Sequence, residues 1–89
     1  MIASERKARI EALLREHFAP LVLEVVDESA AHAGHAGAAG GGGHFAVRIV
    51  AEAFRGRSGV ERHRAVYAAL ASLLSSEIHA LSIDASAPA

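Results

Sequence analysis

The sequence contains no cysteine among its 89 residues. Without cysteine the chain forms no disulfide and offers no thiolate to a metal ion, so it could not hold a conventional four-thiolate iron–sulfur cluster alone. Any site for a soft metal must therefore take its sulfur from another molecule.

Strong net charge and long apolar runs are also missing. Nine Lys and Arg residues against ten Asp and Glu residues give a formal net charge of -1, so no overall field attracts nucleic acid or an anionic membrane. No apolar run approaches the roughly 20 residues that span a bilayer, and the N-terminal segment lacks the apolar stretch of a signal peptide. We therefore expect a soluble cytoplasmic protein without membrane association.

The first half of the chain predicts one helix and two strands. Apolar side chains recur at helical spacing over about residues 4–18, with Ser4 as the expected N-cap. The aliphatic run 21–27 predicts a strand, and apolar alternation over 45–50 predicts a second strand. Residues 29–43 are rich in glycine, alanine and histidine, which predicts an exposed, flexible loop.

The second half predicts a turn, a helix and a last strand. A glycine-containing turn precedes Ser58 and Glu61, which have the spacing of a capping box at the start of a helix that runs to about residue 75. Residues 78–83 predict the final strand.

The order of elements is helix, strand, strand, helical turn, helix, strand, which predicts an α+β fold. The length allows one domain, which we place at residues 1–84, with a frayed tail at 85–89. A helix that connects two strands of one sheet makes those strands parallel, so the expected sheet is mixed and three-stranded with the helices on one face.

Histidine is abundant, with six residues in the chain. His32 and His35 form a pair in the predicted loop where both imidazoles could meet a metal ion, although solvated loop histidines are the commoner explanation of such spacing. His44 and His79 lie at strand starts. Strand alternation puts His79 on the face of Leu81, which favours a partly buried structural histidine, but a loop folded over that end could bring His79 and His32 together.

Basic residues gather around the start of the second long helix. Arg57, Arg62, His63 and Arg64 could recognise nucleic acid or an anionic partner, whereas a solvated helix face explains them at least as well. No phosphate-binding loop or nucleophile motif is present, so we do not expect an enzyme.

Several blocks of the sequence resemble the BolA family, in order and at the family's separations. The blocks are Asp27-Glu28-Ser29-Ala30-Ala31-His32, His44-Phe45-Ala46-Val47-Arg48-Ile49-Val50, Phe54-Arg55-Gly56, Val60-Glu61-Arg62-His63-Arg64-Ala65-Val66-Tyr67 and Ile78-His79-Ala80-Leu81-Ser82-Ile83. Together they span nearly the whole chain. The resemblance implies a fold similar to the class II KH domain.

The resemblance also implies a partner and a cofactor. Members of the family bind monothiol glutaredoxins, and the pair can hold a [2Fe–2S] cluster through the glutaredoxin cysteine, glutathione and a histidine of the BolA-like protein. His79 matches the family's C-terminal ligand histidine, and His32 matches its variable loop ligand, with His35 as an alternative. By the same resemblance, residues 62–64 would form the helix face beside the cluster or the partner surface.

Three functional hypotheses follow. The leading one is an interaction protein that shares a [2Fe–2S] cluster with a monothiol glutaredoxin in cluster trafficking or iron sensing. The alternative is a KH-like DNA-binding regulator of transcription that uses the basic helix, and the third is a histidine site for a divalent metal in the isolated chain. Alone, the protein is expected to be a monomer or a weak homodimer.

Overall fold

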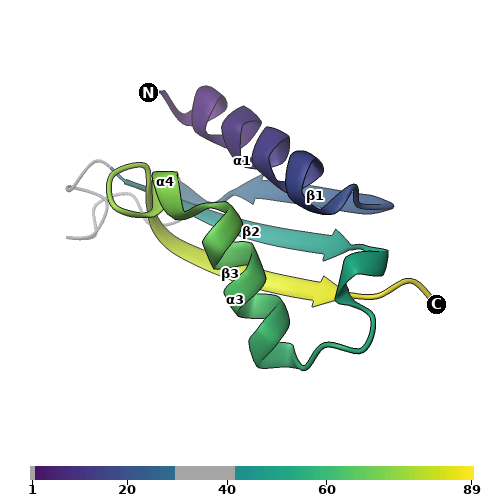
Figure 1. Cartoon of the computed structure of the whole chain (residues 1–89). Coiled ribbons are helices and arrows are strands. Elements are labelled where there is room, and N and C mark those ends of the chain that lie inside the picture. Colours follow the sequence, from purple (N-terminus) through teal and green to yellow (C-terminus); the bar gives the residue numbers. More distant parts are fainter. Residues whose placement is uncertain (1, 30–41) are drawn as a thin grey trace.

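The computed structural model describes residues 2–29 and 42–89, so the predicted ligands His32 and His35 lie outside the described part. The described elements are α1 (Ala3–Phe18), β1 (Val22–Asp27), β2 (Gly43–Val50), the short 3-10 helix η2 (Glu52–Phe54), α3 (Gly59–Ala69), α4 (Ala71–Leu74) and β3 (Ile78–Ser86). The helices pack on one face of the sheet (Figure 1), which confirms the predicted α+β fold. Within the described part, no helix is long and apolar enough to cross a membrane.

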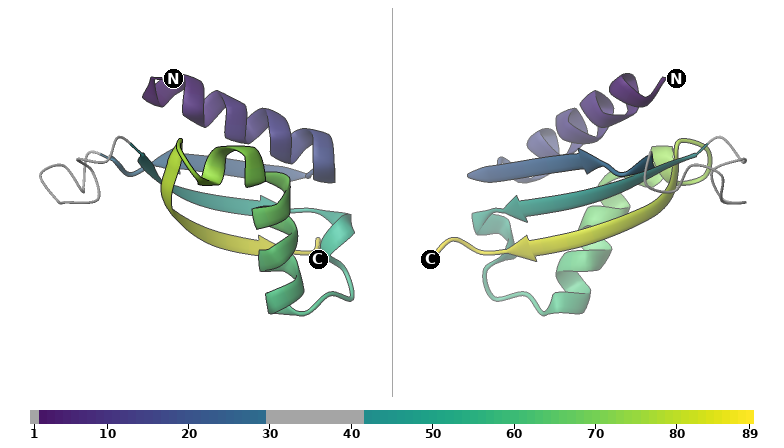
Figure 2. Two further views of the ribbon diagram at one scale, coloured as in Figure 1. Left: turned by 60° about the vertical axis from the view of Figure 1, so that its left-hand side comes forward. Right: turned by 180° about the vertical axis from the view of Figure 1, so that it is seen from behind.

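The sheet has the strand order β1-β2-β3, with β2 in the centre. The β1 and β2 strands are antiparallel, whereas β2 and β3 are parallel because the chain passes through α3 and α4 between them. The predicted mixed, three-stranded sheet is therefore confirmed. Seen from behind (Figure 2, right), the opposite face of the sheet is not covered by any of the described helices.

The core lies between this sheet and the helices. The central strand supplies Phe45, Val47 and Ile49, which alternate with less buried residues as the sequence pattern predicted. The remaining fully buried large side chains come from the helices and the turn after β2; they are Ile10, Leu14, Phe54, Val66 and Leu70. Phe54 is fully buried, and its ring centre lies 4.9 Å from that of Phe18 at the end of α1.

Helix α3 begins at the predicted capping box. The Ser58 hydroxyl accepts a hydrogen bond from the Glu61 amide at 3.1 Å, and the Glu61 carboxylate accepts one from the Ser58 amide at 2.7 Å. By contrast, Ser4 is not the N-cap of α1, because the helix begins one residue earlier and its N-cap position is Ile2. The single helix expected up to residue 75 is divided at Leu70, where the backbone leaves the helical conformation at φ -101° and ψ 9°.

The last strand extends further than the sequence pattern indicated. β3 continues to Ser86, whose carbonyl accepts a hydrogen bond from the Ala51 amide at 3.0 Å, and the Arg55 side chain donates to the Pro88 carbonyl at 2.9 Å. The expected frayed tail is therefore wrong for residues 85–86, because small residues that carry little hydrophobic signal still complete the ladder with β2.

We predict that Phe54→Ala lowers the free energy of unfolding by about 3–5 kcal/mol, because it leaves a cavity between α1 and the sheet. Urea unfolding measures this loss. Val60→Ala is the matched control, since Val60 is 59% exposed and its truncation should change stability by less than about 0.5 kcal/mol. Equal losses in both variants would show that Phe54 is not a core residue.

Candidate metal-binding site at the start of β3

His79 lies on an irregularity in the parallel pairing of β2 and β3. Gly43 pairs with Ile78 and the next residue, His44, pairs with Ala80, so His79 is an extra residue in β3. Ile78 is buried, whereas His79 and Ala80 are both exposed. The expectation that His79 alternates onto the face of Leu81 is therefore wrong, because the bulge shifts the alternation by one residue.

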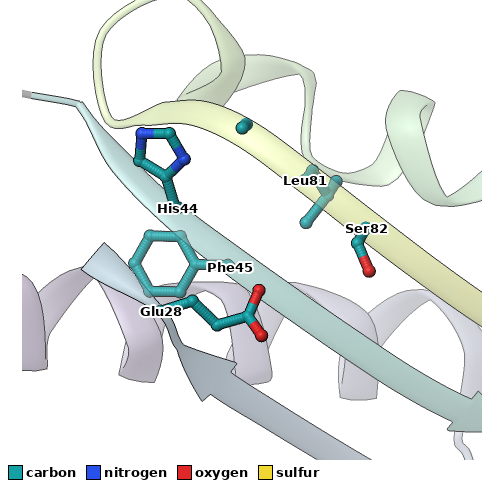
Figure 3. A pocket seen from close by; sticks show the side chains of 6 residues that line it. Glu28, His44, Phe45, Leu81 and Ser82 are labelled. Carbon is teal, nitrogen blue, oxygen red and sulfur yellow. The ribbon is translucent and has the colours of Figure 1, made fainter. Parts of the chain in front are cut away.

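His44 is the side chain that the bulge brings next to His79. The two ring centres are 5.2 Å apart and their planes are inclined at 50°. His44 is half-buried, with its Nε2 atom shielded from solvent. Figure 3 shows its ring at the start of β2 beside β3, with Glu28 on the side of β1.

The sequence pattern placed His44 at a strand start but did not indicate a role for it. The available signal was its position directly after the loop, at the start of a strand that is parallel to the strand of His79. Two strand starts lie at the same edge of a parallel pair, so their side chains are close in space.

Backbone hydrogen bonds fix the start of β2 against the end of β1. The His44 amide donates to the Ser29 hydroxyl at 3.1 Å, and the Glu28 amide donates to the His44 carbonyl at 2.7 Å. The Ser29 amide in turn donates to Oδ1 of Asp27 at 2.9 Å. Hydrogen bonding from Ser29 lowers the pKa of the Asp27 carboxyl below its usual value, so this carboxylate holds the turn in its ionised form at neutral pH.

The turn before β3 is fixed from two sides. The Gly43 amide donates to the Glu77 carbonyl at 3.1 Å, which ties β2 to this turn. The Arg6 guanidinium on α1 pairs with the Glu77 carboxylate at 3.0 Å and lowers the pKa of that carboxyl. His79 thus follows a segment that is held by both α1 and β2.

Two glycines have no room for a side chain beside the histidines. A Cβ atom on Gly42 would lie 2.9 Å from Cβ of His79 and 3.1 Å from its backbone nitrogen. A Cβ atom on Gly43 would overlap the ring of Phe45 in the same strand. These two glycines are therefore required by packing, at the point where β2 begins.

The described part of the chain supplies a pair of histidines here and no larger set of ligands. Among residues 2–29 and 42–89, no group of three or more His, Asp or Glu side chains is placed to hold a metal ion. His32 and His35 lie outside these residues, so their predicted role as loop ligands is not tested by the structure.

The predicted basic cluster, Arg57 before α3 and residues 62–64 within it, lies away from the histidine pair. Arg62 is half-buried and donates to the carbonyl of Phe54 at 3.1 Å and to that of Ala85 at 3.4 Å, so it ties the helix to the end of β3. Arg57 and Arg64 are exposed. His63, the fourth residue of the predicted basic cluster, is also exposed, and its ring stacks on that of Tyr67 with the ring centres 5.3 Å apart.

The basic cluster and His79 lie at opposite ends of β3. Arg62 contacts Ala85, six residues along the strand from His79, which corresponds to about 20 Å. Of the two roles expected for residues 62–64, a helix face beside the ligand histidine is therefore wrong, whereas a role in the partner surface stays a prediction. Sequence proximity within each block gave no information on the distance between the blocks.

The geometry therefore defines a class of protein: an α+β module with a mixed three-stranded sheet and a histidine pair at one end of β3. A family model described as BolA-like protein matches residues 14–89. The chain belongs to the BolA family.

Individual proteins support this assignment. The chain is 47% identical over 89 residues to SufE-like protein 1, chloroplastic/mitochondrial, from Arabidopsis thaliana, covering 94% of this chain but 24% of that protein. It is 44% identical over 80 residues to the DNA-binding transcriptional regulator BolA of Escherichia coli, covering 86% of this chain and 70% of that protein.

The fold is also that of solved members of the family. The BolA domain of SufE1 from Arabidopsis thaliana superposes with a TM-score of 0.84 at 44% identity, covering 99% of this chain and 96% of that domain. The mixed sheet with its helices is therefore the fold of the family.

We predict that Gly42→Ala displaces His79 and costs about 1–3 kcal/mol of stability, because the new methyl group overlaps the His79 backbone and Cβ. Urea unfolding and the NMR signals of the His79 ring measure the two effects. Gly59→Ala is the matched control, since a Cβ at Gly59 meets nothing within 4 Å. Unchanged His79 signals in Gly42→Ala would contradict the close packing described above.

Proposed function

We propose that the protein is a non-enzymatic partner of a monothiol glutaredoxin, and that it contributes histidine to a [2Fe–2S] cluster shared with the glutaredoxin cysteine and glutathione. Its role would lie in iron–sulfur cluster trafficking or iron sensing. The observation that carries this proposal is the exposed His79 on the bulge at the start of β3, in a chain that has no cysteine.

The donor set of the chain suits a shared cluster. The chain offers imidazoles but no cysteine thiolate, so the sulfur ligands of a cluster must come from another molecule. Imidazole in place of thiolate makes such a cluster less negative and raises its reduction potential. His32, or His35 in its place, is the second ligand that we expect from the family resemblance.

The surroundings of His79 support a fixed ligand position on an accessible edge. Gly42 contacts the histidine backbone closely, and the Arg6–Glu77 ion pair and the Gly43 amide hold the preceding turn. A ligand side chain that is held by its own backbone loses less conformational entropy on binding. His79 is exposed, so a partner could reach its ring without unfolding the sheet.

A second candidate function is DNA binding. The E. coli relative is named a DNA-binding transcriptional regulator, and Arg57, His63 and Arg64 are exposed around the start of α3 in this protein. Two observations weigh against it as the main function. The net charge of the chain is -1, and the Arg62 guanidinium is engaged with backbone carbonyls.

The experiment mixes the protein with a monothiol glutaredoxin, glutathione, iron and sulfide, and records visible absorption and circular dichroism. We expect a heterodimeric cluster spectrum that differs from that of the glutaredoxin alone. His79→Ala should alter or abolish this spectrum. His32→Ala should do the same if His32 is the second ligand, and His35→Ala should do so if His35 takes its place. Arg64→Ala is the control variant, because Arg64 lies at the other end of the sheet, and it should leave the spectrum unchanged.

Two results would overturn this proposal. One is a glutaredoxin spectrum that the protein does not change, with no complex on size-exclusion chromatography. The other is DNA binding that depends steeply on salt and is weakened by Arg57→Ala and Arg64→Ala but not by His79→Ala, which would favour the second candidate.

A further inference from the structure

The pair formed by His44 and His79 has a geometry that suits one metal ion. A zinc–nitrogen bond is about 2.0–2.1 Å long, and a ring nitrogen lies about 1.2 Å from the centre of an imidazole, so each ring centre would be about 3.2 Å from the metal. At a tetrahedral angle two such rings have their centres about 5 Å apart, and at the right angle of a tetragonal Cu²⁺ site about 4.5 Å. The observed separation of the two ring centres is 5.2 Å.

The backbones that carry the two rings are fixed relative to each other. The His44 amide donates to the Ser29 hydroxyl and the His44 carbonyl accepts from the Glu28 amide, and His79 is the extra residue of the bulge that faces it. The close approach at Gly42 fixes the backbone of His79 relative to the chain that leads into His44. The pair therefore does not need to be assembled by the metal, which lowers the entropy cost of binding.

We propose that His44 and His79 together bind one divalent transition-metal ion in the protein alone, with His44 as a ligand that acts beside His79. Two imidazoles select borderline metals such as Cu²⁺, Ni²⁺ and Zn²⁺ over Mg²⁺ and Ca²⁺, which require oxygen ligands. The remaining coordination positions go to water or to an outside molecule, because the described residues contain no third donor in place.

His44 and His79 differ in their access to solvent. His79 is exposed, whereas Nε2 of His44 is shielded, so the metal reaches the pair from the side of His79. This inference shares His79 with the proposed function. Its test contains no glutaredoxin, glutathione, iron or sulfide, so it can fail while the cluster proposal stands, and the reverse also holds.

The test is a titration of the full chain with Cu²⁺, followed by calorimetry and by electron paramagnetic resonance of the bound ion. We expect one Cu²⁺ per chain with hyperfine coupling to two imidazole nitrogens. His44→Ala and His79→Ala should each weaken binding at least tenfold. The double variant with His32→Ala and His35→Ala should retain binding within about twofold, because those residues are not part of the pair.

Two controls separate ligand loss from misfolding. His63→Ala removes an exposed histidine at the far end of the sheet and should bind Cu²⁺ as the wild type does. His44→Asn keeps a polar side chain at the same strand position, so it tests the ligand if His44→Ala does not fold. In the wild type, Cu²⁺ should broaden the NMR signals of Gly43 and Ala80 first.

The proposal is overturned if His44→Asn and His79→Ala bind Cu²⁺ as tightly as the wild type. It is also overturned if the double loop variant loses all binding, or if the first broadened signals belong to the start of α3.

Discussion

His79 is the extra residue of a β-bulge, because Ile78, His79 and Ala80 of β3 lie opposite only Gly43 and His44 of β2. Counted back from Leu81 by strict alternation, His79 would face the helices; the bulge breaks this alternation, so that Ile78 takes the helix side instead. The bulge exposes the ring and places it against His44. The proposed chemistry therefore depends on a pairing irregularity between two strands.

The central strand β2 connects this irregularity to the stability of the fold. Its residues Phe45, Val47 and Ile49 are buried against the helices, so the strand is held firmly just beyond His44. Near the other end of the same sheet lies the start of α3 with its exposed basic residues, about 20 Å from His79. One small core thus supports two chemically different surfaces, and substitutions at one end can be compared with substitutions at the other.

Local rules predicted the features whose interacting partners are close in sequence. The capping box of Ser58 and Glu61 is an example, because both partners lie within one helical turn. The orientation of His79 could not be predicted in this way, since it depends on the register with a strand 35 residues earlier in the chain. The sequence did not predict the break between α3 and α4 at Leu70, because neither glycine nor proline marks it. Leu70 and Leu73 are both buried at this break.

The most direct measurement of the central claim is an NMR titration of ¹⁵N-labelled protein with cluster-loaded monothiol glutaredoxin. If the exposed His79 binds the cluster, the largest changes should fall on the amides of Gly43, His44, His79 and Ala80, where β2 and β3 begin. The amide of Arg64 in α3 should not change. Changes confined to the start of α3, with unaltered signals around His79, would show that the partner does not bind at His79.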